Sequence, residues 1–146
     1  MNSSEFTSLR LSQLLYTSSR LMIQQIQLRL NELGLTYLQY LVLSILWEID
    51  GLKVHELGER LSLDSGTLTP LLKKLEVQNL LKRKRGENDE RTVSIHLTYQ
   101  GKSLQTKTLA ILQELEDQLT SRLGKSTEKL IPQAEVFLEN LKTLKK

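Results

Sequence analysis

The first third of the chain repeats apolar residues with the period of an amphipathic helix. Between Thr7 and Leu30 they recur at every third or fourth position, which predicts one long helix with an apolar face. Asn31 to Leu35 should end it. A second helix is expected over Tyr37 to Glu48, because Thr36 and Gln39 have the spacing of a capping box. Its nearly all-apolar composition is typical of a helix buried on most sides.

Two short helices joined by a polar turn are expected next. Asp50 and Gly51 indicate a turn, and Leu52 to Val54 a short extended piece. The helices should cover His55 to Leu61 and then run from about Ser65, with Asp64 or Ser65 as the N-cap, to about residue 79. Two short helices around a tight turn form a helix-turn-helix.

The segment after this motif has the pattern of a β-hairpin. Apolar and polar residues alternate over Val93 to Leu97, Leu80 to Arg85 contains four consecutive cations, and Gly86 to Glu90 has the composition of a turn. We therefore expect an antiparallel hairpin with a charged tip. A helix-turn-helix followed directly by a basic hairpin is a winged helix, in which the hairpin is the wing.

Two further helices complete the pattern. Thr98 is expected to cap one from about Tyr99 to Leu123, and Ser126 to cap another from about residue 127 to 144, which Pro132 should interrupt or delay. The predicted fold class is mainly α with a small β-hairpin. We expect one domain over 1–146, with a winged helix-turn-helix lobe over 32–98 and a helical dimerisation lobe from 1–31 and 99–146. The terminal helices carry apolar faces too wide for one chain of this size to cover, which favours a homodimer.

Composition narrows the class of protein. With 39% hydrophobic and 25% charged residues the chain should fold as a globular protein. No stretch approaches the roughly 18 apolar residues of a membrane-spanning helix, and the first residues lack a signal peptide pattern, so we expect a cytoplasmic protein. Cysteine is absent, which excludes disulfides and thiolate metal sites. We expect no cofactor and no metal.

Positive charge is concentrated around the predicted wing. The net charge is only +3, but seven of the twenty Lys and Arg residues lie between Lys73 and Arg91. Such a run is often a solvated face. Beside a helix-turn-helix, however, it favours double-stranded DNA as the partner.

The predicted recognition helix begins with short side chains suited to base edges and phosphates. Hydroxyl groups there can donate or accept, and free backbone N–H groups suit phosphate oxygens. Helix capping is a compatible alternative for Ser65 and Thr67. Pro70 is interpreted as a first-turn proline without a contact. The predicted DNA-binding residues of this helix are Ser65, Gly66, Thr67 and Thr69, with Lys73 and Lys74 one turn further on.

In the wing, only two of the four consecutive cations can face DNA, because side chains alternate along a strand. We select Arg83 and Arg85. Arg91 lies where a hairpin tip can insert a guanidinium into the minor groove. Asp89 or Glu90 can hold this arginine extended, although turn formation and solubility explain the acids equally well.

Enzyme chemistry is not indicated, and we assign no catalytic residue. Asp64 to Gly66 lacks the G-x-S-x-G elbow, and His55 lacks the second histidine of H-E-x-x-H. A helical adaptor that contacts proteins instead of DNA is a rival interpretation. The two differ in salt dependence, because DNA binding weakens steeply as salt rises.

Three segments carry a family resemblance: LTYLQYLVLSILWE, VHELGERLSLDSGTLTPLLKKLE and DERTVSIHLTYQG. They resemble MarR-family transcription factors over about residues 9–103. LDSGTLTPLLKKLE and LLYTSSR are similar to the organic hydroperoxide-responsive, OhrR-like branch. The resemblance implies a homodimeric winged-helix repressor of a peroxide or oxidative stress response gene, whose two recognition helices bind a pseudo-palindromic operator.

The resemblance also implies a sensor position in the first helix. OhrR-like proteins carry a reactive cysteine in the pattern L-C-x-x-L-Y-x-x-S-R, where this chain has Ser12, followed by Tyr16. A hydroxyl cannot form the sulfenic acid that registers peroxide. Tyr16 and Tyr37 match the tyrosine partners of the thiol, whereas Ile26 replaces a third tyrosine. Two explanations stay open: an engineered serine that preserves the reduced state, or a natural regulator with another signal.

The second explanation includes release from DNA by a small-molecule ligand. MarR-like folds commonly place a pocket between the dimer helices and the DNA-binding lobe. Tyr16, Tyr37, Tyr40 and Trp47 are candidates to line it, although aromatic residues at helical spacing usually belong to a core. The sequence names no ligand.

Overall fold

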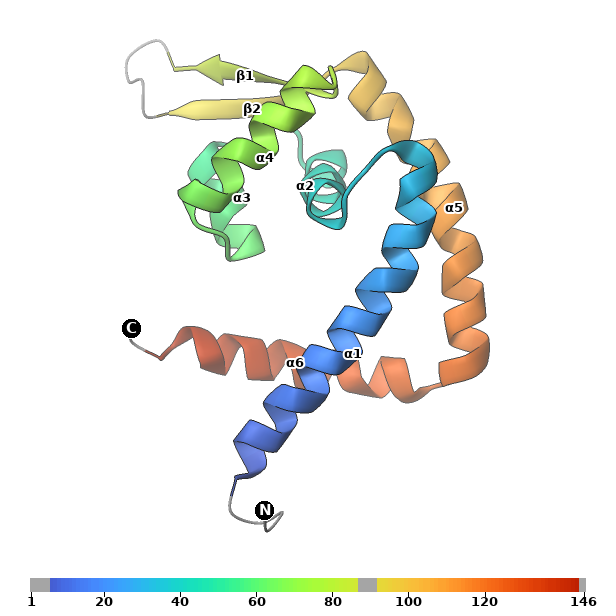
Figure 1. Ribbon diagram of the computed structural model, residues 1–146. Helices are drawn as coiled ribbons and strands as arrows, with labels where there is room; N and C mark the ends of the chain where they lie inside the picture. The colour runs from blue at the N-terminus through green and yellow to red at the C-terminus, as the bar shows by residue number, and fades with distance from the viewer. Residues whose placement is uncertain (1–5, 87–91, 145–146) are drawn as a thin grey trace. The chain divides into compact units, whose positions relative to one another are not determined.

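The structure, a computed structural model, describes residues 6–86 and 92–144 and confirms the mainly α fold with one small hairpin. The elements in chain order are α1 (Thr7–Leu30), the 3-10 helix η1 (Asn31–Leu33), α2 (Tyr37–Glu48), α3 (Val54–Leu61), α4 (Ser65–Val77), β1 (Leu81–Arg85), β2 (Val93–Leu97), α5 (Tyr99–Leu123) and α6 (Ser126–Lys142). The chain forms two compact units, 1–111 and 112–146. Figure 1 shows α3 and α4 joined to the two-stranded hairpin within the first unit.

The expected helix-turn-helix is present, with small shifts at its ends. The extended piece before it is reduced to a bridge between Lys53 and Ser94. α3 begins one residue earlier than expected, at Val54, because Lys53 already has the extended conformation of an N-cap. α4 ends at Val77, two residues early, since Asn79 takes a left-handed conformation with φ 60°.

The expectations for α6 are corrected. Ser126 is the first helical residue, not the cap, because Lys125 before it is already helical and offers no extended N-cap position. Pro132 lies inside α6 and neither interrupts nor delays it. A proline removes one backbone hydrogen bond, and the remaining bonds keep the helix continuous.

The core of the first unit is built mainly from leucines. On α4 the buried residues are spaced three and four apart, which places them on one face of the helix. α2 contributes Gln39 and three apolar residues, and each wing strand adds one buried side chain. The buried apolar residues of α2, α3, α4 and the hairpin are Val42, Leu43, Leu46, Leu57, Leu68, Leu71, Leu72, Leu75, Leu81 and Ile95. Helix α4 and the hairpin therefore pack against the same core.

Thr98 joins the base of the hairpin to the next helix. Its Oγ1 accepts a hydrogen bond from the Gly101 N–H at 3.0 Å, as expected for the cap of α5. The same hydroxyl donates to the Asn79 backbone oxygen at 2.7 Å. The cap therefore also ties α5 to the connection between α4 and β1.

Within 6–86 and 92–144, no helix combines the length and apolar character that crossing a membrane requires.

Candidate nucleic-acid interface

Asp64 starts the candidate recognition helix α4. It has extended backbone angles, and its Oδ1 accepts a hydrogen bond from the Thr67 N–H at 2.7 Å. Of the two predicted caps, Asp64 is the one that forms. The Ser65 hydroxyl is outside this capping bond and stands at the first position of the helix, where a DNA contact is geometrically open to it.

The leucines of α4 define which residues face outward. With Leu68, Leu71, Leu72 and Leu75 buried, successive rotations of about 100° place a different set on the opposite side. Val77 belongs to that set and is 87% exposed. The outward residues are Gly66, Pro70, Lys73 and Val77. Lys73 is thus well placed for a phosphate contact.

Pro70 is not a first-turn residue. It is the sixth residue of α4, so the interpretation as a first-turn proline is wrong. Its ring lies on the outward face and displaces no core residue. The Gly66 carbonyl loses the N–H partner that any other residue at position 70 would supply.

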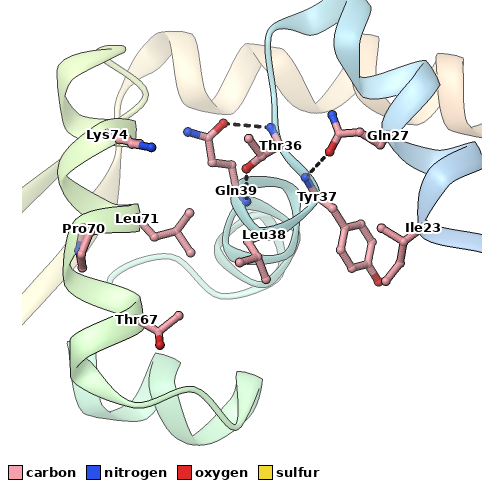
Figure 2. Close-up of a pocket in the computed structure, with 10 residues that line it drawn as sticks. All are labelled: Ile23, Gln27, Thr36, Tyr37, Leu38, Gln39, Thr67, Pro70, Leu71 and Lys74. Carbon is pink, nitrogen blue, oxygen red and sulfur yellow. Dashed lines mark hydrogen bonds between the residues drawn. The ribbon is translucent and has the colours of Figure 1, made fainter. Parts of the chain in front are cut away.

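One flank of α4 borders a cavity of about 640 Å³. Thr67 and Lys74 point into it from α4, and Tyr37 lies across it beside Ile23 of α1 (Figure 2). The lining residues are Ile23, Gln27, Thr36, Tyr37, Leu38, Gln39, Thr67, Pro70, Leu71 and Lys74. Two of the predicted DNA-binding residues, Thr67 and Lys74, therefore stand at the edge between the outward face and this cavity.

The other flank of α4 faces the wing. Thr69 lines a small hollow of about 190 Å³ together with Leu72 and Arg83. The Arg83 guanidinium meets the Glu76 carboxylate through Nε at 3.1 Å and Nη2 at 3.2 Å. The hydrogen bond from Arg83 lowers the pKa of the Glu76 carboxyl from its ordinary value of 4.5. Sequence reasoning selected Arg83 for DNA and missed its acidic partner.

The pairing of the wing strands assigns their faces. Arg83 is opposite Ile95, and Arg85 is opposite Val93. Because side chains alternate, both arginines share the face of the buried Leu81 and Ile95, while Lys82 and Lys84 lie on the other face. The predicted tip residues Arg91 and Asp89 lie outside the described residues.

Of the predicted sensor residues, Ser12 and Tyr16 lie one helical turn apart on α1, whereas Tyr37 lies away from them within one chain. The Ser12 hydroxyl donates to the Leu9 backbone oxygen at 2.7 Å on an exposed stretch of α1, and Tyr16 is 68% exposed. Tyr37 instead packs near Ile23. Ile23 is eleven positions along α1 from Ser12, or roughly 16 Å at about 1.5 Å per residue. A site joining Ser12 to Tyr37 requires a second chain.

Only some of the aromatic residues expected to line a pocket do so; others pack against one another. Tyr37 lines the cavity, whereas Tyr40 packs between Tyr37 and Trp47 with ring centroids 6.3 and 6.5 Å apart. Burial, and then the neighbouring Tyr37, raise the pKa of the Tyr40 phenol above 10.0. Tyr40 therefore remains a neutral phenol at neutral pH.

Three glutamines, Gln27, Gln39 and Gln78, make hydrogen bonds around the connection between α1 and α2 that the sequence did not indicate. Gln27 of α1 donates to the Leu35 oxygen and accepts from the Tyr37 N–H, at 2.8 and 2.9 Å. Gln39 closes the capping box of α2 and donates to Gln78 at 3.0 Å. The capping box was visible in the sequence as Thr36 and Gln39, but no local pattern indicated the links between helices.

Comparisons with known proteins identify the family. Residues 24–108 match the model of the transcriptional regulator SarA/Rot family. The organic hydroperoxide resistance transcriptional regulator of Bacillus subtilis is 53% identical over 98 residues, which cover 67% of each chain. The structure of reduced AbfR bound to DNA has a TM-score of 0.84 and 32% identity, covering 96% of this chain and 97% of that one. A MarR transcriptional regulator from Methanosarcina mazei has a TM-score of 0.78 and 25% identity, covering 92% and 98%.

These likenesses span the winged helix and the helices around it. The matched proteins are transcriptional regulators and not enzymes. The chain therefore belongs to the SarA/Rot and MarR-type winged-helix family, in the branch similar to the organic hydroperoxide regulators, and is a DNA-binding transcriptional regulator.

Proposed function

We propose that the protein acts as a homodimer that binds a pseudo-palindromic DNA operator. The observation that carries this proposal is α1, a helix of 24 residues of which only Leu30 is buried. Its exposed apolar side chains include Leu11, Leu14, Leu15 and Leu21, an apolar surface of the kind that a second copy covers. Two copies related by a two-fold axis would present their α4 helices to half-sites about 34 to 36 Å apart.

In the proposed complex the start of α4 enters the major groove. Gly66 on the outward face, Thr67 and Thr69 on its two flanks, and Ser65 at the exposed first position of the helix would meet base edges, while Lys73 and Lys74 would meet phosphates. The wing would supply Arg85 and, from the tip, Arg91 positioned by Asp89. The similar protein AbfR has been solved in its reduced form bound to DNA, which supports the choice of partner.

We further propose that the protein represses a gene of the peroxide or oxidative stress response and that Ser12 stands at the position of a sensing thiol. The likeness to a Bacillus subtilis organic hydroperoxide resistance regulator supports this assignment. Ser12 keeps a hydrogen bond to Leu9 that a reduced thiol can also make. Since a hydroxyl is not oxidised by hydroperoxides, this chain would stay in the DNA-binding state.

The experiment adds cumene hydroperoxide to the protein bound to a fluorescein-labelled duplex, selected from a randomised pool by the unsubstituted protein. Fluorescence anisotropy should stay constant for the unsubstituted protein and fall for Ser12→Cys. Ser19→Cys is a matched control, because Ser19 also lies on α1 and donates to a backbone oxygen three residues earlier, at 3.0 Å. Release of the unsubstituted protein, or equal release of both cysteine variants, would refute the assignment of Ser12.

A ligand-released regulator is the second candidate, and the 640 Å³ cavity favours it. Its position between α1 and α4 would let an occupant change the recognition helix. This candidate gains support if Ser12→Cys binds the duplex but is not released by hydroperoxide. Substituting Leu38→Trp would then fill the cavity and should change DNA affinity.

A further inference from the structure

The direction of the wing is set at a short connection after α4. Only residues 78–80 separate α4 from β1. Asn79 takes a left-handed conformation, and the Leu80 N–H donates to the Leu75 oxygen at 3.0 Å. A change of backbone angle in these three residues would swing the whole hairpin relative to the recognition helix.

An ion pair between Arg83 and Glu76 bridges the connection between α4 and β1. Glu76 lies in the last turn of α4, Arg83 is the third residue of β1, and the guanidinium makes two hydrogen bonds, at 3.1 and 3.2 Å, to the two carboxylate oxygens. A planar guanidinium bound through two nitrogens fixes orientation as well as distance. The pair thus restrains the angle between the strand and the helix.

The course of the Arg83 side chain agrees with this role. Arg83 lines the hollow beside Thr69 and Leu72 of α4, and it stands opposite the buried Ile95 on the inner face of the hairpin. Its aliphatic stem thereby covers apolar surface, as arginine stems commonly do. A phosphate ligand would instead direct its guanidinium to solvent and not to an acid of α4.

We propose that Arg83 is a positioning residue, which through Glu76 holds the wing at a fixed angle to α4 so that both reach one duplex together. It is not itself a phosphate ligand. Two elements that must contact DNA at the same time bind more tightly when their relative position is fixed beforehand, because less freedom is lost on binding. Glu76 then aids DNA binding although it is an acid. The inference rests on the proposed DNA binding.

The test measures affinity for the selected duplex at a series of salt concentrations. A phosphate ligand and a positioning residue differ in the slope of log K against log salt, which changes by about 0.9 for each phosphate that the protein no longer neutralises. Lys73→Gln, on the outward face of α4, shows the effect of removing a phosphate ligand. Arg83→Gln should weaken binding about two- to fivefold, the range of an exposed ion pair, and leave the slope unchanged.

Glu76→Gln gives the sharpest distinction, because the two roles predict opposite signs. If Arg83 positions the wing, removing the acid weakens binding about as much as Arg83→Gln does, and the double variant is no weaker than either. If Arg83 binds phosphate, removing the acid frees it and tightens binding. Arg83→Lys keeps the charge but cannot bind Glu76 through two nitrogens, so it should leave the salt slope unchanged and still weaken binding.

The charge-reversed pair E76R with R83E should recover most of the affinity that either single change removes. Thermal unfolding of each variant shows whether an affinity change reflects loss of fold, and the variants should unfold within a few degrees of the unsubstituted protein. The proposal is overturned if Arg83→Gln lowers the slope as much as Lys73→Gln, or if Glu76→Gln leaves affinity unchanged or tightens it. Failure of the unsubstituted protein to bind any duplex would instead refute the proposed function.

Discussion

The Trp47 indole of α2 donates a hydrogen bond from Nε1 to the Gly101 backbone oxygen in the first turn of α5, at 2.8 Å. On its other side Gly101 lies against the wing connection, where an added Cβ would collide with the Leu80 backbone oxygen. The absence of a side chain at this position therefore lets α2, α5 and the start of the wing meet.

Gly101→Ala should lower the free energy of unfolding by about 2 kcal/mol or more, because the methyl group forces backbone apart. Urea unfolding followed by circular dichroism measures it. Gly66→Ala is the control: a Cβ there is 3.4 Å from the Asp64 carboxylate, and alanine in place of a helical glycine should stabilise by up to about 1 kcal/mol. Equal losses in the two variants would contradict the close approach at Gly101.

Gln39→Leu should destabilise the protein by about 1 to 3 kcal/mol, because Gln39 is buried and its removal takes the acceptor from the Thr36 N–H and the donor from the Gln78 Oε1. Chemical denaturation measures the difference. Gln113→Leu, on an exposed part of α5 where Gln113 bonds only within its own helix in the described residues, should stay within about 0.5 kcal/mol. A negligible effect of Gln39→Leu would show that these hydrogen bonds add no stability.

The ion pair at the wing predicts a pH dependence. Arg83 lowers the pKa of Glu76 below 4.5, so the folded state favours the ionised carboxylate. Its stabilising effect is therefore fully present above pH 4.5 and is lost as pH falls through the lowered pKa. The stability difference between the unsubstituted protein and Glu76→Gln should be present at neutral pH and vanish in acid. Arg83→Gln should follow the same profile; a difference independent of pH would exclude this cause.

Substitutions of different residues on α4 should affect either base preference or overall DNA affinity. If Thr69 and Thr67 meet base edges as proposed, Thr69→Ala and Thr67→Ala should change the sequences selected from a randomised duplex pool. Lys73→Gln should weaken binding to all sequences alike and reduce the salt slope by about 0.9. Selection followed by sequencing and salt titration measures both. The opposite assignment of effects would mean that α4 enters the groove in another orientation.

The sequence predicts most of the fold because its local patterns are strong. The bounds of α1, α2 and α5 follow from periodicity and from caps at Thr36 and Thr98. The predicted helix ends fail where the backbone conformation of a neighbouring residue determines the cap. Lys125 is already helical, so Ser126 cannot act as a cap. The sequence also predicts too large an effect of Pro132. Helix α6 stays continuous without the one backbone hydrogen bond that the proline removes.

The sequence predicts which residue types belong to the candidate site, but not which residues they contact. The hydroxyls and Lys73 of α4 are placed by helical period alone. Alternation with the buried Leu81 places Arg83 on the inner face of the hairpin. Its contact with Glu76 also needs the turn at Asn79, which no local pattern indicates. The ion pair between two residues seven positions apart depends on that turn.

Mass measurement of the protein bound to its selected duplex tests the central proposal most directly. Light scattering coupled to size exclusion should give two chains per duplex, and two chains for the free protein. A single chain on the duplex, or a free monomer that binds no duplex in dilute buffer, would contradict the proposed dimeric DNA-binding regulator.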